Sequence, residues 1–151
     1  MTEPIVFIHG LFNVLFDLNA AMYCAPRLVL MPDLLGYGRN FDTPRGEISV
    51  HTQAAFIEAL LTATGYERAH FIAHSVGGVV GVVLARQHPH RVASLINVEG
   101  NFTLKDAFWS QAIASMTDVE AKELLEDYQS NPAPDAVPKP LSHFVRKTTG
   151  P

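Results

Sequence analysis

The stretch that decides the fold is Ala73-His74-Ser75-Val76-Gly77-Gly78. It lies between an apolar run at residues 70–73 and an almost wholly apolar segment at residues 76–87. We interpret the first as a buried strand and the second as an inner helix, so that Ser75 lies on a tight strand-to-helix turn. Such a turn lifts a serine hydroxyl above the edge of a sheet and requires small residues two positions to either side. Ala73 and Gly77 occupy those two positions.

Three further apolar runs, at residues 5–8, 28–31 and 92–98, have the character of strands. None of them alternates cleanly between polar and apolar residues, which is typical of strands that are buried on both faces of a parallel sheet. Between the second and third strands, Ser49 is a candidate cap for an amphipathic helix that ends near Gly65. Strands and helices that alternate in this way predict an α/β fold with right-handed crossovers.

A second motif, His9-Gly10-Leu11-Phe12, follows the first strand. A nucleophilic serine needs an oxyanion hole, which is a pair of backbone N–H groups directed at the developing negative charge. Val76, the residue after the serine, can supply one of these groups, and either Leu11 or Phe12 can supply the other. Gly10 allows the loop to approach the site closely.

The order of these motifs, with Asp33-Leu34-Leu35-Gly36-Tyr37-Gly38 after the second strand, resembles the α/β-hydrolase fold over residues 4 to about 100. The resemblance implies that Ser75 is the nucleophile, that Val76 and Leu11 donate to the oxyanion, and that His9 shapes the loop. Phe12 is a candidate to line an acyl pocket. The resemblance further implies that the four strands lie in the order second, first, third, fourth.

We expect three parts along the chain. Residues 1–103 form the α/β-hydrolase core, a parallel sheet of about four strands with flanking helices. Residues 104–130 form a partial helical cap whose second helix opens with the capping-box pattern Thr117-Asp118-Val119-Glu120, and residues 131–151 form a proline-rich linker and tail. Because the superfamily normally has about eight strands, the resemblance implies a shortened hydrolase that begins at the third.

The resemblance places the usual acid after the seventh strand and the usual histidine after the eighth, so both positions lie beyond this chain. Glu99 follows the fourth strand at the same edge as Ser75, and some members of the superfamily carry their acid there. Glu99 is therefore the candidate acid. His143 is the candidate base, because it is the histidine in the right chain order.

The other histidines are weaker candidates for the base. Those that precede strands belong at the opposite edge of the sheet from Ser75: His70, His88 and His90. His74 adjoins the nucleophile, but we expect it to point into the packing. His51 opens a helix at the edge that carries Ser75, where we expect it to serve as a cap or as a surface residue.

The function that these motifs predict is a serine hydrolase, esterase-like, acting on a small-molecule ester-like substrate. The alternative is a catalytically inactive or partner-dependent truncated hydrolase that acts as a binding module, and a lyase could use the same serine–histidine geometry. A homodimer would cover sheet edges that are otherwise exposed. No metal or organic cofactor is implied.

Composition restricts the remaining classes. The 151 residues are 48% hydrophobic and 17% charged, which excludes disorder, and a net charge of -4 gives no driving force for nucleic-acid binding. The single Cys24 can form no intrachain disulfide, so a reduced, cytoplasmic setting is expected. The longest apolar run, at residues 76–85, is far shorter than the roughly 20 residues of a membrane span. The acidic start Met1-Thr2-Glu3-Pro4 argues against a secretory signal.

Overall fold

A computed structural model describes residues 2–11, 22–100, 102–103, 105–106, 111–112 and 114–130. The chain divides into two units, Met1–Asn101 and Phe102–Pro151. Phe12, His143 and the linker and tail expected at residues 131–151 lie outside the described residues.

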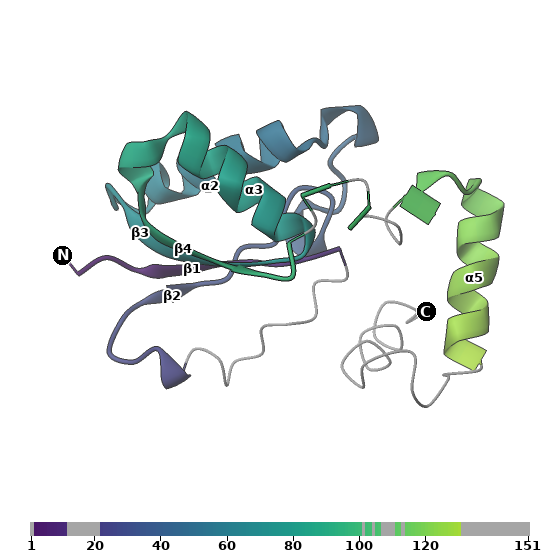
Figure 1. Cartoon of the computed structure of the whole chain (residues 1–151), viewed down its shortest axis with the longest axis horizontal. Helices are drawn as coiled ribbons and strands as arrows, with labels where there is room; N and C mark the ends of the chain where they lie inside the picture. The colour runs from purple at the N-terminus through teal and green to yellow at the C-terminus, as the bar shows by residue number, and fades with distance from the viewer. Residues whose placement is uncertain are drawn as a thin grey trace. The chain divides into compact units, whose positions relative to one another are not determined.

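The first unit is built on a parallel four-stranded sheet (Figure 1). Its strands are β1 (Ile5–Ile8), β2 (Val29–Leu30), β3 (Ala69–His74) and β4 (Val92–Val98). They lie in the order β2-β1-β3-β4, which confirms the order that the resemblance implied. The direction of winding therefore reverses between β1 and β3, and ligands of open α/β sheets bind at such a point.

The second strand is shorter than the sequence predicted. Residues 28–31 are all apolar, yet only Val29 and Leu30 pair with β1, and Leu28 and Met31 are exposed. Within the described sheet β2 has a neighbour on one side only. Pro32, which follows Met31, lacks the N–H group that a longer ladder would need.

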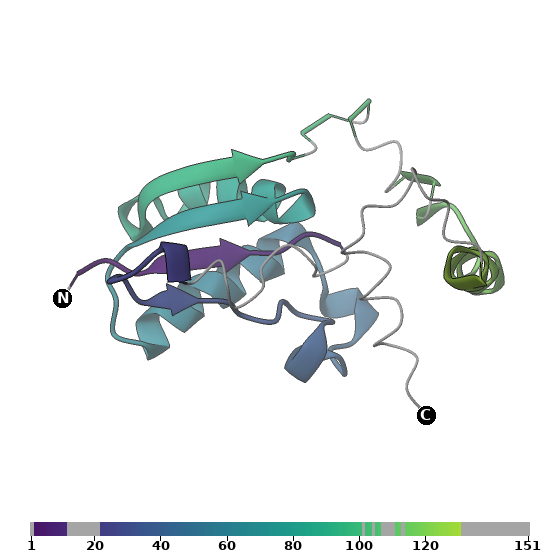
Figure 2. The ribbon, with the colours of Figure 1, turned by 90° about the horizontal axis from the view of Figure 1, so that it is seen from below.

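Two helices, α2 (Val50–Ala63) and α3 (Val76–Gln87), pack over one face of the sheet (Figures 1 and 2). Ser49 caps α2 as predicted, since its side chain accepts a hydrogen bond from the backbone N–H of Thr52. The core between the helices and the sheet is formed by strand residues and helix residues that are fully buried: Val6, Ile8, Phe71, Ala73, Ile57, Leu61, Val80 and Leu84.

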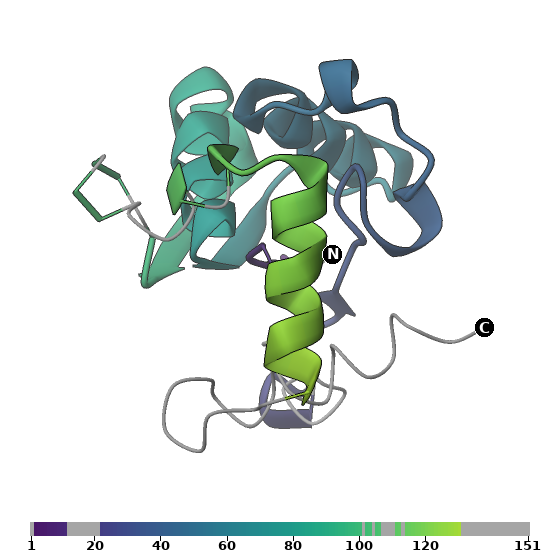
Figure 3. The same cartoon turned by 90° about the vertical axis from the view of Figure 1, so that its right-hand side faces the viewer.

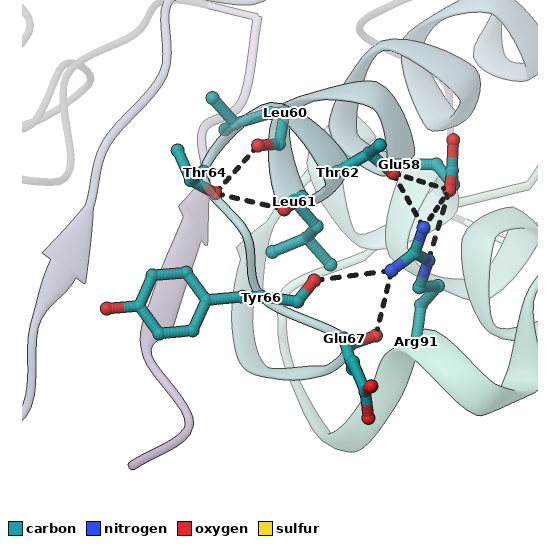
Figure 4. Close-up of polar contacts among 8 residues, drawn as sticks. All are labelled: Glu58, Leu60, Leu61, Thr62, Thr64, Tyr66, Glu67 and Arg91. Carbon is teal, nitrogen blue, oxygen red and sulfur yellow. Dashed lines mark hydrogen bonds and ion pairs between the residues drawn. The ribbon is translucent and has the colours of Figure 1, made fainter. Parts of the chain in front are cut away.

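Arg91 ties the amino-terminal end of β4 to α2 (Figure 4). It ends the short helix η3 (Pro89–Arg91), and its guanidinium donates to Glu58 Oε1 through Nε at 3.0 Å. Further bonds reach the carbonyl oxygens of Tyr66 and Glu67, both at 3.2 Å. The Arg91 hydrogen bond is the main reason that the pKa of Glu58 lies below its ordinary value.

Two short helices, η1 (Gly38–Asn40) and η2 (Arg45–Glu47), connect β2 to α2. In the second unit, α5 (Asp118–Ser130) is a continuous helix (Figure 3). The predicted capping box opens it, because Glu120 Oε2 accepts from the Thr117 N–H at 2.7 Å and Thr117 Oγ1 accepts from the Glu120 N–H at 3.3 Å. Within the described ranges, no helix combines the length and apolar character that crossing a membrane requires.

Candidate functional site

Ser75 has a strained backbone. Its φ of 53° and ψ of -124° lie outside the regions that residues with a side chain ordinarily adopt. The conformation is held from two sides: the Ser75 N–H donates to the Val98 carbonyl at 2.9 Å, and the Ser75 carbonyl accepts from the Gly78 N–H at 2.9 Å. The side chain makes no capping hydrogen bond to α3. The hydroxyl is therefore not used to start the helix, and strain of this kind clusters at functional sites.

Close backbone approach explains the small residues around Ser75. A Cβ atom at Gly77 would collide with the carbonyl oxygens of Ile8 and His9 at the end of β1. A Cβ at Gly81, one helical turn further on, would lie 2.8 Å from Leu95 Cδ1. Only a helix that lacks side chains at these points can begin directly above the sheet, as the turn around Ser75 requires.

The loop after β1 lies beside Ser75. A Cβ placed on Gly10 would be 3.0 Å from Ser75 Cβ and 2.6 Å from His74 Nδ1. Leu11 follows Gly10 directly and is partly exposed, and Val76 is the first residue of α3. The first N–H groups of an α-helix have no partner within that helix, so the Val76 N–H is of the kind that can receive an anion. The structure thus brings Gly10, Leu11, Ser75 and Val76 to one edge of the sheet.

His9 is buried and holds the base of this loop. Its Nδ1 lies 2.8 Å from the Gly10 carbonyl oxygen, and its Nε2 lies 3.1 Å from the backbone nitrogen of Leu34. A carbonyl can only accept and an N–H can only donate, so the neutral ring carries its proton on Nδ1. Burial lowers the pKa of His9, with the Gly10 hydrogen bond and the charge of Asp33 opposing the shift. Both ring nitrogens are occupied, which makes His9 a structural link between two loops.

The loop after β2 is fixed by side-chain bonds to its backbone. Gln53 of α2 accepts from the Leu35 N–H and donates to the Leu35 carbonyl, both at 2.9 Å. Asp33 Oδ2 accepts from the Arg39 N–H at 3.2 Å. Gly38 has a φ of 45°, and a Cβ there would collide with the Asp33 carboxylate. Hydrogen bonds thus hold the motif that begins at Asp33 in one turn next to the His9 loop.

Glu99 lies where the sequence predicted, immediately after β4 at the edge that carries Ser75. Its φ is 54° and its side chain is 83% exposed. The carboxylate Oε2 lies 3.5 Å from His74 Nε2, so His74 is the histidine that Glu99 meets within the described residues. The sequence alone does not predict this pair.

The remaining described histidines do not reach Ser75. As predicted, His70 lies near the start of β3, at the opposite edge, where its Nδ1 lies 2.8 Å from Ser94 Oγ and its Nε2 lies 3.2 Å from Glu3 Oε2. His88 and His90 lie before β4, at that same opposite edge.

His51 is a surface residue near the start of α2, which is one of the two roles expected for it. Its Nδ1 lies 3.1 Å from Gln87 Nε2, at the last residue of α3. A helix of 12 residues is about 18 Å long, so His51 is at the far end of α3 from Ser75. Nor does His51 cap α2, since that role belongs to Ser49.

Comparison with known proteins agrees with this geometry. A family model described as the alpha/beta hydrolase fold matches residues 3–136. The chain belongs to the alpha/beta hydrolase fold family. Within the described ranges, this hydrolase-fold chain has no group of three or more histidine, cysteine, aspartate or glutamate side chains that could hold a metal ion.

An uncharacterized protein of Mycobacterium tuberculosis is 36% identical over 104 residues, which are 68% of this hydrolase-fold chain and 30% of that protein. Among solved structures, a hydrolase from Pseudomonas aeruginosa superposes with a TM-score of 0.70 at 24% identity over 95% of this chain and 57% of its own. A marine microorganism esterase superposes with a TM-score of 0.68 at 22% identity, over 97% of this chain and 59% of its own. The chain thus spans less than a third of that curated relative and somewhat more than half of these hydrolase structures.

Proposed function

We propose that this chain carries the nucleophile and oxyanion half of a serine hydrolase of the carboxylic-ester type. The observation that supports it is the strained backbone of Ser75 at the junction of β3 and α3, next to the Gly10 loop. Ser75 makes no capping bond, and its position above the sheet edge is the one a nucleophile needs. Membership of the alpha/beta hydrolase fold family agrees with this chemistry but does not identify the substrate.

The proposed reaction follows from the residues at this edge. Ser75 Oγ attacks the carbonyl carbon of an ester and passes its proton to a histidine, while the carbonyl electron pair moves onto oxygen. The N–H groups of Leu11 and Val76 hold that oxyanion. Collapse of the intermediate expels the alcohol, and water then releases the acyl group from Ser75. For the base and the acid, the chain order nominates His143 and Glu99.

An active-site fluorophosphonate tests this proposal directly, because it labels a serine only where the hydroxyl is activated. We expect the wild-type chain to be labelled at Ser75, with the position read by peptide mass spectrometry, and Ser75→Ala to remain unlabelled. Ser115, a serine of the second unit, provides a matched control, since Ser115→Ala should be labelled like the wild type. A folded, monodisperse wild-type sample that takes up no label would refute the hydrolase proposal.

A binding module that depends on a partner is the second candidate. The favouring observation lies on β4, the last strand of the described sheet, where Ile96 and Val98 are 55% and 39% exposed. An open strand edge with apolar side chains is a template for pairing with another strand. A second copy of this chain is the partner that we propose, because a strand edge can pair with its own copy across a two-fold axis.

A further inference from the structure

We propose that two copies of this chain join their sheets by antiparallel pairing of β4, in the register that places Ile96 opposite Ile96 of the second copy. This inference rests on the partner-dependent binding module, the second candidate function, and it specifies which atoms and side chains of that module meet. It is carried by the directions in which the backbone groups and side chains of β4 point.

The backbone of β4 shows which of its polar groups a partner can reach. The Ser75 N–H donates to the Val98 carbonyl, so the polar backbone groups of Val98 face β3. Because successive residues of a strand direct their N–H and C=O groups to opposite sides, those of Leu95 and Asn97 point away from β3. No strand of the described sheet lies on that side (Figure 2). Leu95 and Asn97 therefore offer two donors and two acceptors at the edge of the sheet.

The side chains of β4 divide between the two faces of the sheet. A Cβ on Gly81 would lie 2.8 Å from Leu95 Cδ1, so Leu95 points toward α3. In the same way, a Cβ on Gly78 would collide with Asn97 Oδ1. Since side chains alternate along a strand, Ile96 lies on the face opposite α3, where it is 55% exposed. Pairing at this edge can therefore bring the two Ile96 side chains together on one face.

The two ends of β4 exclude other two-fold registers. A register centred nearer the start of the strand sets Ala93 opposite Leu95 or Asn97. Ala93 is the extra residue where the pairing of β4 with β3 shifts, so its groups are not aligned for a regular ladder. A register centred nearer the end sets Glu99 opposite one of them, and Glu99 has a φ of 54°, which is not extended.

The register centred on Ile96 uses only regular residues. Leu95 of each copy exchanges two hydrogen bonds with Asn97 of the other, so all four outward N–H groups of the two strands find an acceptor. Ile96 faces Ile96 as a pair that makes no ladder hydrogen bonds, the kind whose Cα atoms are closest, at about 4.5 Å. Ser94 lies opposite Val98 on the same face.

The charge pattern favours the antiparallel direction. No residue from 92 to 98 is charged, whereas Arg91 precedes the strand and Glu99 follows it. Antiparallel pairing turns the Glu99 of each copy toward the Arg91 end of the other and keeps the two Glu99 residues roughly 20 Å apart along the strands. Parallel pairing would set them side by side. Arg91 is already bound to Glu58, so the separation of the two carboxylates is the main effect.

Disulfide trapping in the full chain tests this register, after the single cysteine has been removed by Cys24→Ser. In that background Ile96→Cys should form a disulfide-linked dimer under oxidised glutathione, because a Cα separation of about 4.5 Å lies within the span of a disulfide. Val98→Cys alone should stay monomeric on a non-reducing gel, since its two copies lie about 14 Å apart along the strands. Mixed chains carrying Val98→Cys and Ser94→Cys should cross-link. Val82→Cys, at an exposed site on α3, measures the rate of random collision.

The contrary results are distinct. If the wild-type chain is a dimer by sedimentation equilibrium but Ile96→Cys cross-links no faster than Val82→Cys, and the mixed chains do not cross-link, the register is wrong and the dimer stands. Cross-linking between Ile96→Cys and Ser94→Cys chains instead would move the axis to Leu95 and overturn the inference. A chain that is monomeric at tens of micromolar would overturn both the dimer and its register. None of these measurements depends on a reactive serine, so the hydrolase proposal is tested separately.

Discussion

At the scale of single residues, Ser75 carries backbone strain that lowers the stability of the fold. A residue with a side chain at such a φ and ψ costs about 1–3 kcal/mol, and the bonds to Val98 and Gly78 keep it there. A glycine would adopt the same backbone without that cost but would lose the hydroxyl. Holding the Ser75 hydroxyl at the sheet edge therefore costs this backbone strain.

We expect Ser75→Gly to be at least as stable as the wild type, because relief of strain contributes about 1–3 kcal/mol and the added unfolded-chain entropy removes about 0.5–1 kcal/mol of that gain. Ser75→Ala keeps the Cβ and the strain, so its stability should change by less than about 0.5 kcal/mol. Urea unfolding measures both values. A Ser75→Gly variant that is clearly less stable would contradict strain at this position.

The sequence predicted the turn at Ser75, the loop beside it after β1 and the edge at which Glu99 lies, because each follows directly from a motif at the end of a strand. It did not predict that Glu99 meets His74. That contact depends on the register of β3 against β4, which pairs His74 with Val98 and so brings the next residue, Glu99, beside the ring. Apolar runs identify strands but do not fix their register.

At the scale of elements, the contact between α3 and the end of β1 depends on Gly77. We expect Gly77→Ala to destabilise the chain by about 1–3 kcal/mol or more, because its Cβ would meet backbone carbonyls that cannot move aside cheaply. Gly46→Ala is the matched control, since a Cβ there meets nothing within 4 Å. The midpoints of thermal unfolding of Gly77→Ala and Gly46→Ala are the values to compare. Equal midpoints would show that helix and strand are further apart than the structure places them.

The bounds of α2, α3, β1 and β4 could be predicted from caps and apolar runs, whereas two features of elements could not. The run at residues 28–31 pairs only through Val29 and Leu30, because pairing depends on the neighbouring strand as well as on composition. His51 meets the end of α3 because α2 and α3 cross, and the sequence of one helix does not reveal that angle.

At the scale of the whole molecule, β4 is an edge strand of the described sheet, and this edge predicts self-association. We expect Ile96→Lys to shift the chain from dimer toward monomer in sedimentation equilibrium, because a charge on the exposed apolar face of the edge strand opposes pairing. Val82→Lys introduces the same charge at an exposed valine of α3 and should leave the dimer intact. A wild-type chain that is monomeric at tens of micromolar would contradict the dimer proposal.

The free energy of unfolding should vary with pH in the way that the lowered pKa of His9 requires. Burial holds its folded pKa below the unfolded value of about 6.5, so below that pH the unfolded chain binds more protons than the folded one. The stability that neutral His9 contributes is complete above about pH 6.5 and is lost as the pH falls toward the lowered pKa. One proton limits the slope to about 1.4 kcal/mol per pH unit.

We expect His9→Asn to be less stable at pH 8, because the Leu34 N–H loses its acceptor, but to lose less further stability between pH 7 and pH 5 than the wild type. His51→Asn, at an exposed site, should keep the wild-type slope in urea unfolding. If His9→Asn also keeps that slope, the proton that is excluded on folding belongs to another group.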